Sequence, residues 1–165
     1  MQTKTLNPDQ IISLYDYPLQ SDDALNKYFK MCELGEKVPF VPVIRKNVVR
    51  KYFDDEMLKE FEEFEKKNPA AKYFMLDGNH RTTALTLAGC KIEVIIYEKD
   101  KDISQAKKLV DSGQILENGT LDQTLQGNCE ILKKMLEKHL DFITVEQKTK
   151  KMIKDKILPK NIVNS

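Results

Sequence analysis

The sequence has almost no excess of either charge. Its 165 residues include 27 Lys and Arg against 26 Asp and Glu, a formal net charge of +1. Domains that bind duplex DNA usually have a high isoelectric point or basic side chains clustered on one face. The overall balance therefore disfavours nucleic acid as a partner, and only a local basic patch would support it.

Cysteine is scarce. The three cysteines, Cys32, Cys90 and Cys129, are far apart, and no Cys-x-x-Cys pair or Cys/His ligand spacing occurs. A structural zinc site needs four such ligands at characteristic spacings, so no metal site is predicted from these residues. The expected state is three reduced thiols in a cytoplasmic protein.

Long apolar runs are also missing. Residues 1–5 have no apolar segment behind them, so the sequence does not predict a signal peptide. No stretch approaches the roughly 18 apolar residues of a membrane span, and we expect no membrane partner. Internal repeats and low-complexity segments are absent too. With 41% hydrophobic and 32% charged residues, the composition is typical of a folded globular chain.

The first fifty residues contain one predicted helix and one predicted strand. Residues 6–10 form a turn-like segment around a proline. Ser21 is a helix N-cap, and the helix continues to about Met31. Residues 38–44 are apolar and β-branched, which predicts a strand. The two prolines in it cannot donate ladder hydrogen bonds, which places this strand at a sheet edge or at a strand entrance.

The middle of the chain alternates helix and strand. The helix from Asp54 has an apolar face of Met57, Leu58, Phe61 and Phe64 at spacings of three and four residues. A buried strand over 72–76 then ends at Asp77-Gly78, a helix follows over 79–87 with Gly89 as its C-terminal cap, and a second strand occupies 92–97. This order predicts a compact βαβ-like unit.

The remaining residues are predicted to be helical. The first helix contains Ile103 to Val110 and is capped by Gly113, and a longer one extends from Leu121 to Leu140, with His139 in a packing or surface role. Because its apolar residues surround much of this longer helix, we expect burial against another helix or in a homo-oligomer. A third helix over 143–157 is basic, with Lys148, Lys150, Lys151, Lys154 and Lys156. Such a run usually forms a solvated helix face, and an acidic or nucleic-acid partner is the alternative.

The turn between the strand at 72–76 and the next helix is the predicted site. The first amides of a helix have no intrahelical acceptor and lie at the positive end of its dipole, so they favour phosphate. Gly78 permits a positive φ and a close approach of a ligand. Arg81 offers a forked set of donors, and His80 can donate a hydrogen bond or transfer a proton. Asn79, Thr82 and Thr83 complete the predicted phosphate-binding set.

A purely structural reading of this turn remains open. Arg81 in the first turn opposes the helix dipole, which costs stability unless an anion is near. Asp77 can be that anion, acting as the N-cap of the helix and as the partner of Arg81. In that case the turn binds no ligand, and Arg81 contributes to stability alone.

Residues 76–84, Leu-Asp-Gly-Asn-His-Arg-Thr-Thr-Ala, together with Leu87-Ala88-Gly89 and the strand 92–97, resemble the signature of the ParB/sulfiredoxin superfamily. Gly78, Arg81 and Ala84 match the Gly-x-x-Arg-x-x-Ala pattern of ParB-type CTPases. The turn is also similar to the Asp-Gly-His-His-Arg type of the ADP-dependent free serine kinases, and Leu6 to Gln10 faintly resembles a Leu-x-Pro segment near the start of these domains.

The resemblance implies an α+β fold, with a small mixed β-sheet and packed helices over residues 1–100. A helical C-terminal extension would follow over 101–158 and a flexible tail over 159–165. The sequence departs from the family at two positions of the turn. Sulfiredoxins have their reactive cysteine where this chain has Asn79, which argues against sulfinic acid reduction. ParB proteins have a second arginine in place of His80, followed by a helix-turn-helix that is not recognisable here.

The resemblance also implies nucleotide chemistry. ATP, ADP or CTP would bind with Mg²⁺, and a small molecule would accept the phosphate or water would hydrolyse the nucleotide. Asp77, His80 and Arg81 are the predicted catalytic residues. The base would be an N-terminal carboxylate, from the candidates Asp9, Asp22, Asp23 and Glu36.

Two other functions remain. The first is a non-catalytic module in which a bound nucleotide orders the C-terminal helices. The second is a nuclease, which ranks last because such sites need several carboxylates and only Asp77 is local. Aromatic residues for a nucleotide base would come from the N-terminal section, although core packing is favoured for most of them: Tyr15, Tyr17, Tyr28 and Phe29.

Overall fold

The computed structural model describes residues 1–14, 17, 19, 21–138 and 141–163. The predictions for Tyr15, His139 and Leu140 lie outside the described residues.

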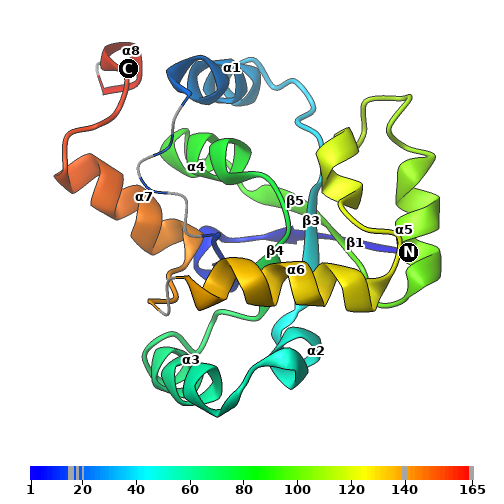
Figure 1. Cartoon of the computed structure of the whole chain (residues 1–165). Coiled ribbons are helices and arrows are strands. Elements are labelled where there is room, and N and C mark those ends of the chain that lie inside the picture. Colours follow the sequence, from blue (N-terminus) through cyan, green and yellow to red (C-terminus); the bar gives the residue numbers. More distant parts are fainter. Residues whose placement is uncertain (15–16, 18, 20, 139–140, 164–165) are drawn as a thin grey trace.

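The centre of the molecule is a five-stranded mixed sheet (Figure 1). Its strands are β1 Gln2–Leu6, β2 Ile11–Ile12, β3 Val41–Arg45, β4 Tyr73–Met75 and β5 Ile92–Ile96. The strand order is β1-β5-β3-β4-β2. β3 is antiparallel to β4 and parallel to β5, β1 is antiparallel to β5, and β2 is parallel to β4. A mixed sheet with packed helices is the fold class that the sequence predicts.

Eight α-helices and three short 3-10 helices surround the sheet within the described residues. The α-helices are α1 Asp22–Glu33, α2 Lys46–Val49, α3 Asp55–Lys67, α4 Asn79–Leu87, α5 Asp100–Lys107, α6 Leu125–Glu137, α7 Val145–Lys154 and α8 Lys160–Val163. The 3-10 helices are η1 Pro8–Gln10, η2 Arg50–Tyr52 and η3 Glu117–Thr120. Two predicted starts are confirmed by their caps: Ser21 Oγ accepts from the Ala24 amide, and Asp54 Oδ1 accepts from the Met57 amide.

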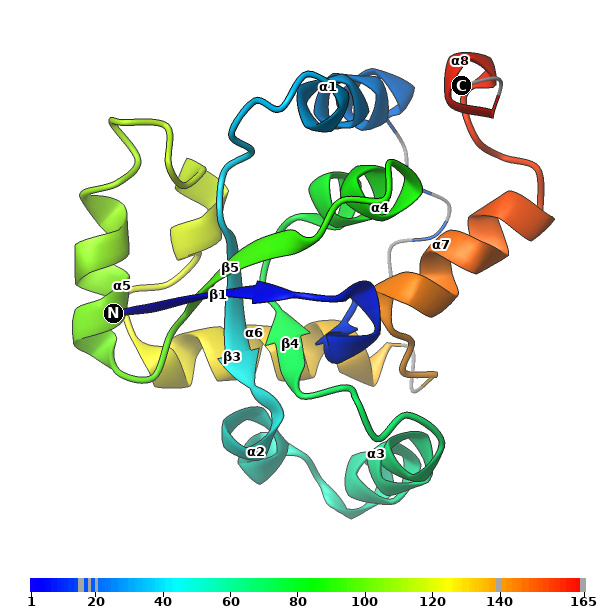
Figure 2. The same cartoon turned by 180° about the vertical axis from the view of Figure 1, so that it is seen from behind.

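The helices form layers on both faces of the sheet (Figure 2). Successive strand residues point to opposite faces, and on β5 Val94 and Ile96 cluster with Leu85 of α4, whereas Ile95 lies in the cluster that contains Leu132 of α6. α1 contributes only Cys32, partly buried, to the edge of the cluster with Val94 and Ile96. It forms an outer layer over α4, where its apolar residues cluster with Ala84.

β4, α4 and β5 do not form the predicted βαβ unit. β3 lies between β4 and β5, and the two strands run in opposite directions because β3 is antiparallel to one and parallel to the other. The order of elements along the chain was predicted correctly. The pairing depends on β3, which comes about thirty residues earlier, and a local pattern contains no information about it.

β3 is the central strand, so its prediction as an edge strand is wrong. Pro42 is its second residue, which agrees with the alternative of a strand entrance. The carbonyl of Pro42 accepts from the Leu76 amide at 2.9 Å, and the register with β4 begins one residue later, at Val43 opposite Met75. The missing amide of Pro42 therefore faces the point where the β3–β4 ladder ends, and costs the sheet little.

α6 packs against the sheet of the same chain. Its residues Cys129, Leu132 and Leu136 are buried in one cluster with Phe74 of β4. The helix begins at Leu125, and Leu121, predicted to be part of it, precedes it and is 44% exposed. α5 likewise ends before the predicted Leu109 and Val110, which belong to a turn.

The basic helix α7 is only partly a solvated face. Lys150, Lys151, Lys154 and Lys156 are exposed, but Lys148 is 2% exposed. It shares the buried face of α7 with Val145, Thr149 and Met152 at helical spacing. The predicted solvated position of Lys148 is therefore wrong.

The C-terminal residues include a helix that was not predicted, and two of the cysteines are joined. Where a flexible tail was expected over 159–165, residues 160–163 form α8, and Ile162 is 6% exposed. Cys32 and Cys90 form a disulfide, so the prediction of three reduced thiols is wrong, while Cys129 is free and buried. Among the described helices, none has the length and apolar character needed to span a membrane.

Candidate functional site

The turn after β4 requires a glycine. Gly78 is the N-cap of α4 and has φ +117°. Residues other than glycine rarely adopt this backbone conformation. A Cβ at this position would lie 3.3 Å from both Nη2 of Arg81 and Cγ2 of Val41. The turn therefore brings the backbone against β3 and against the guanidinium of Arg81.

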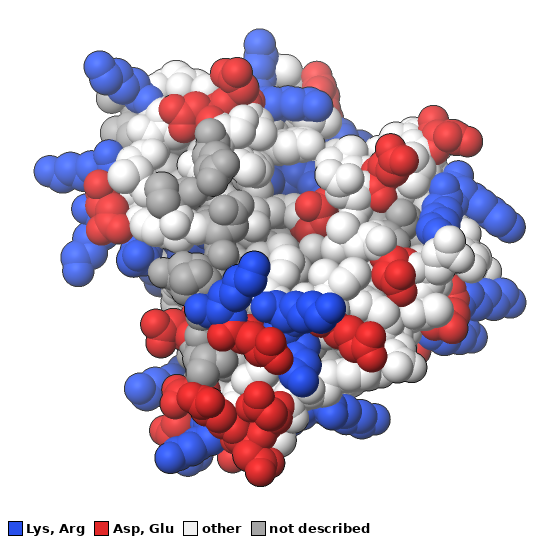
Figure 3. Space-filling model, in the orientation of Figure 1, with Lys and Arg blue, Asp and Glu red and all other residues white. Residues whose placement is uncertain are grey.

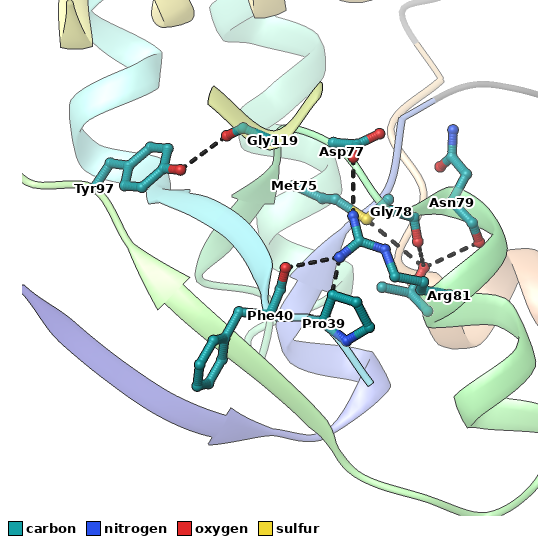
Figure 4. Close-up of polar contacts among 10 residues, drawn as sticks. Pro39, Phe40, Met75, Asp77, Gly78, Asn79, Arg81, Tyr97 and Gly119 are labelled. Carbon is teal, nitrogen blue, oxygen red and sulfur yellow. Dashed lines mark hydrogen bonds and ion pairs between the residues drawn. The ribbon is translucent and has the colours of Figure 1, made fainter. Parts of the chain in front are cut away.

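The guanidinium of Arg81 points toward Asp77 and toward the carbonyls of Pro39 and Phe40 (Figure 4). Its side chain is 2% exposed. Nη1 donates to the carbonyls of Phe40 at 2.7 Å and Pro39 at 3.2 Å, and Nη2 donates to Oδ2 of Asp77 at 2.9 Å. Burial lowers the pKa of the Arg81 guanidinium, and the Asp77 carboxylate opposes that shift. Arg81 thus joins the turn to the segment that enters β3. The predicted ion pair with Asp77 is present, but the prediction of Asp77 as the N-cap is wrong, because Gly78 is the N-cap of α4 and no described side chain caps the helix.

A pocket of about 290 Å³ opens at the N-terminus of α4. Figure 3 shows this face hollowed between α1 and the segment that precedes η3. The side chain of Asp77 is 31% exposed at the pocket. Four segments supply the lining residues: Ala24 and Tyr28 of α1, Asp77 and Gly78 of the turn, Asn79, His80 and Arg81 of α4, and Leu116 and Asn118.

The residues of the first turn of α4, Asn79, His80 and Arg81, line this pocket. The first amide bonded within the helix is that of Thr82, which donates to the Gly78 carbonyl at 2.8 Å. The amides of His80 and Arg81 precede it, at positions where a helix has no acceptor of its own. His80 adds a second polar group, because its Nε2 is buried and has no hydrogen-bond partner among the described residues.

Leu116 and Asn118, at the start of η3, line one side of the pocket, and the sequence did not predict this. Two contacts fix this segment: the Phe40 amide donates to the Gln114 carbonyl at 2.8 Å, and the Tyr97 hydroxyl donates to the Gly119 carbonyl at 2.8 Å. Burial raises the pKa of Tyr97 well above its ordinary value, so its hydroxyl stays a donor. Asn118-Gly119 is a turn pair that could have indicated a loop, but nothing in it indicates the pocket.

Lys148 of α7 also reaches the turn. Its Nζ donates to Oδ1 of Asn79 at 3.3 Å and to the Leu14 carbonyl at 3.1 Å, and Ser13 Oγ donates to the same Asn79 oxygen at 3.3 Å. The side chain of Asn79 is therefore held by groups from two distant segments. The spacing of the buried residues on α7 was the signal that could have separated Lys148 from its exposed neighbours.

Thr82 and Thr83 are not at the pocket. Both are 1% exposed. The hydroxyl of Thr82 donates to the Gly78 carbonyl at 2.8 Å and the Asn79 carbonyl at 3.2 Å. Of the predicted set, the structure brings together Asp77, Gly78, Asn79, His80 and Arg81, with the guanidinium of Arg81 bonded to protein.

The predicted bases do not join this group. None of Asp9, Asp22, Asp23 and Glu36 lines the pocket, and Asp77 is the one carboxylate among its lining residues. Of the aromatic candidates, Tyr28 lines the pocket, Phe29 lies in the α1–α4 cluster, and the Tyr17 hydroxyl bonds to Asp155. Within the described part of the chain, no three His, Cys, Asp or Glu side chains come together as metal ligands.

Comparison with known proteins adds no relative. No family model, curated protein or solved structure matches this chain. On the face in Figure 3, acidic side chains gather over α3 and basic ones over α7, and neither sign surrounds the hollow.

Proposed function

We propose that the pocket at the N-terminus of α4 binds a nucleotide or a related phosphorylated small molecule. The observation that carries the proposal is His80: its buried Nε2 lacks a partner among the described residues, beside the first amides of α4, which have no acceptor within the helix. Buried polar groups in proteins are almost always hydrogen-bonded. A phosphate oxygen would accept from the amides and from the imidazole together.

The rest of the pocket suits the remainder of a nucleotide. Tyr28 and Leu116 supply an aromatic and an apolar wall across from the turn, as in most small-molecule sites. Asn118 is exposed at the rim, where it can bond to a base or a sugar. In this proposal Arg81 does not touch phosphate. It fixes Asp77 and the turn, and so keeps the amides in place.

Binding, rather than catalysis, is the function supported best. The guanidinium donors that would stabilise a transferring phosphoryl group are bonded to Asp77 and to two carbonyls. The contact from Lys148 to Asn79 connects the turn to α7, so a ligand at the turn can bias the C-terminal helices, as in a nucleotide-gated module.

Phosphoryl transfer is the second candidate. It rests on Asp77 and His80, two groups capable of proton transfer or Mg²⁺ contact that line one pocket. Turnover separates the two functions: an enzyme converts nucleotide in the presence of an acceptor, and a binding module leaves it unchanged.

The test uses charge at the pocket rim. Thermal melts with ATP, ADP, CTP and GTP, with and without Mg²⁺, should show a rise of about 5 to 10 °C for a ligand at a hundred times its Kd. Asn118→Asp should then weaken binding, and Asn118→Lys should strengthen it, each by about three- to tenfold through the charge placed near the phosphates. Calorimetric titration measures both.

The matched control is Asn47→Asp on α2, which is exposed and lies outside the pocket. It should leave the affinity unchanged. His80→Phe keeps a ring but removes both nitrogens, and should weaken binding as well. A melting temperature that no nucleotide changes, at millimolar concentrations, would refute the proposal.

A further inference from the structure

The disulfide between Cys32 and Cys90 joins the ends of two helices. Cys32 lies in the last turn of α1, and Cys90 follows Gly89 directly after α4. Both are partly exposed. They line a hollow of about 260 Å³, separate from the pocket at the other end of α4, so a small reductant can reach them. The other lining residues are Gly35, Glu36, Lys37, Val38, Pro39, Leu85, Lys91 and Glu93.

One face of α1 carries both the disulfide and a wall of the ligand pocket. Ala24, Tyr28 and Cys32 are four residues apart, so they lie in a row along the helix. Ala24 and Tyr28 line the pocket at the N-terminus of α4, and Cys32 is bonded beyond the C-terminus of α4. α1 therefore forms one wall of the ligand pocket and is cross-linked at its other end.

Apart from the disulfide, α1 is held by packing between helices and by a hydrogen bond from Asn161 Nδ2 of α8 to Asn26 Oδ1 at 2.8 Å. It belongs to the outer layer over α4 (Figures 1 and 2). Leu25, Tyr28 and Phe29 pack against Ala84 of α4, Met152 of α7 and Ile162 of α8. These contacts are side-chain packing between helices, and the disulfide is the one covalent cross-link among the described residues.

We propose that Cys32 and Cys90 form a redox clasp that fixes α1 on α4 and so controls the pocket. A dithiol reductant opens it. One thiolate of the reductant attacks a protein Sγ and displaces the other Sγ, which takes up a proton. The second thiol of the reductant attacks the mixed disulfide, releases the remaining protein thiol and leaves as a cyclic disulfide. Two electrons pass from the reductant to the protein, and both cysteines end as thiols.

The first test needs no ligand. Denatured without reductant, the chain should show one free thiol, that of Cys129, and after reduction with dithiothreitol it should show three. Reduction of the folded protein should increase amide exchange in α1 tenfold or more and leave α6 unchanged. Three free thiols before reduction, or an α1 whose exchange does not respond, would overturn the clasp.

Variants separate the clasp from a general effect of the reductant. Cys32→Ser and Cys90→Ser should each exchange like the reduced protein and no longer respond to dithiothreitol. Cys129→Ala should retain the full response, because Cys129 is outside the cross-link. A Cys32→Ser chain whose α1 exchanges as slowly as in the oxidised protein would contradict the proposal.

The effect of disulfide reduction on the pocket is measured by the NMR signal of His80, which requires no bound ligand. The chain has two histidines, so His80→Phe assigns the imidazole C2 proton signal by NMR. That signal should shift on reduction in the native sequence and not in Cys32→Ser. An unchanged signal would show that the disulfide does not reach the pocket.

Control of nucleotide binding by the disulfide rests on the proposed function. The experiment distinguishes a failure of this control from a failure of the proposed function. The Kd for the nucleotide that binds should rise at least threefold on reduction. If no nucleotide binds in either state while α1 and His80 respond, the clasp stands and the nucleotide proposal fails. If a nucleotide binds equally in both states, the control of the pocket fails and the proposed function stands.

Discussion

At the scale of single residues, Arg81 holds a charge almost out of contact with solvent. Replacing it by leucine leaves Asp77 and the carbonyls of Pro39 and Phe40 without their donors. We expect Arg81→Leu to lower the free energy of unfolding by about 3 kcal/mol, as when one partner of a buried pair is removed. Urea unfolding measures the loss.

The comparison for Arg81 is Arg45, another arginine in an ion pair. Its side chain is 42% exposed and its Nη2 lies 3.0 Å from Glu98. Because water competes for both groups, Arg45→Leu should cost less than about 1 kcal/mol. Equal losses for the two variants would contradict the structural role of Arg81.

Cys129 differs from the other cysteines in its ionisation. Burial raises the pKa of its thiol from 9.0 to about 11, with a smaller contribution from Glu130. At pH 8 the folded protein should therefore resist alkylation at Cys129 by iodoacetamide, whereas the denatured chain reacts. The same shift favours folding fully below pH 9, and that contribution is lost as the pH rises toward 11. Mass spectrometry after a timed alkylation at pH 8 checks the prediction, and rapid labelling of the folded chain would contradict it.

At the scale of elements, the turn into α4 depends on Gly78. Gly78→Ala adds a Cβ at φ +117° and presses it against Val41 and Arg81. We expect a loss of about 1 to 3 kcal/mol in the free energy of unfolding. Gly35→Ala is the matched control, because Gly35 also has a positive φ, +69°, but nothing lies within 4 Å of its added Cβ. A loss at Gly35 as large as that at Gly78 would show that φ, rather than the close approach to β3, accounts for the cost.

At the scale of the whole molecule, the helices after residue 100 complete the core of the sheet. Leu132 and Leu136 of α6 share a buried cluster with Phe74 and Ile95. A chain of residues 1–100 would expose that cluster, so we expect it to lack a cooperative unfolding transition and dispersed NMR signals. In the full chain, Leu132→Ala should lower the melting temperature of a single transition, through a loss of about 2 to 5 kcal/mol. A well-dispersed spectrum from residues 1–100 alone would show that they form a separate domain.

The sequence predicts local structure better than it predicts which strands pair in the sheet. The cap at Ser21, the helix start at Asp54 and the glycine turn at Gly78 follow from chemistry within a few residues, and the structure confirms them. β1, with one buried residue among five, has no apolar pattern to detect. The position of β3 in the middle of the sheet depends on pairings across the whole chain.

The same limit applies to the candidate site. The residues of the turn were predicted together because they are consecutive in the sequence. Lys148 and Asn118 reach it from distant segments, and one resembles its exposed neighbours while the other resembles an ordinary loop residue. The inward direction of Arg81 could not be predicted, since the carbonyls that it bonds belong to the segment before β3.

Pro42 has a consequence for the chain while it is being made. β3 leaves the ribosome before both of its neighbours, β4 and β5. At about 5 to 20 residues per second, an apolar strand therefore waits several seconds for its partners. A strand with free amides on both sides could meanwhile pair with another nascent chain, and proline interrupts such pairing because it offers no amide. The residue that is tolerated at the end of the finished ladder is thus one that would limit such pairing of the central strand during synthesis.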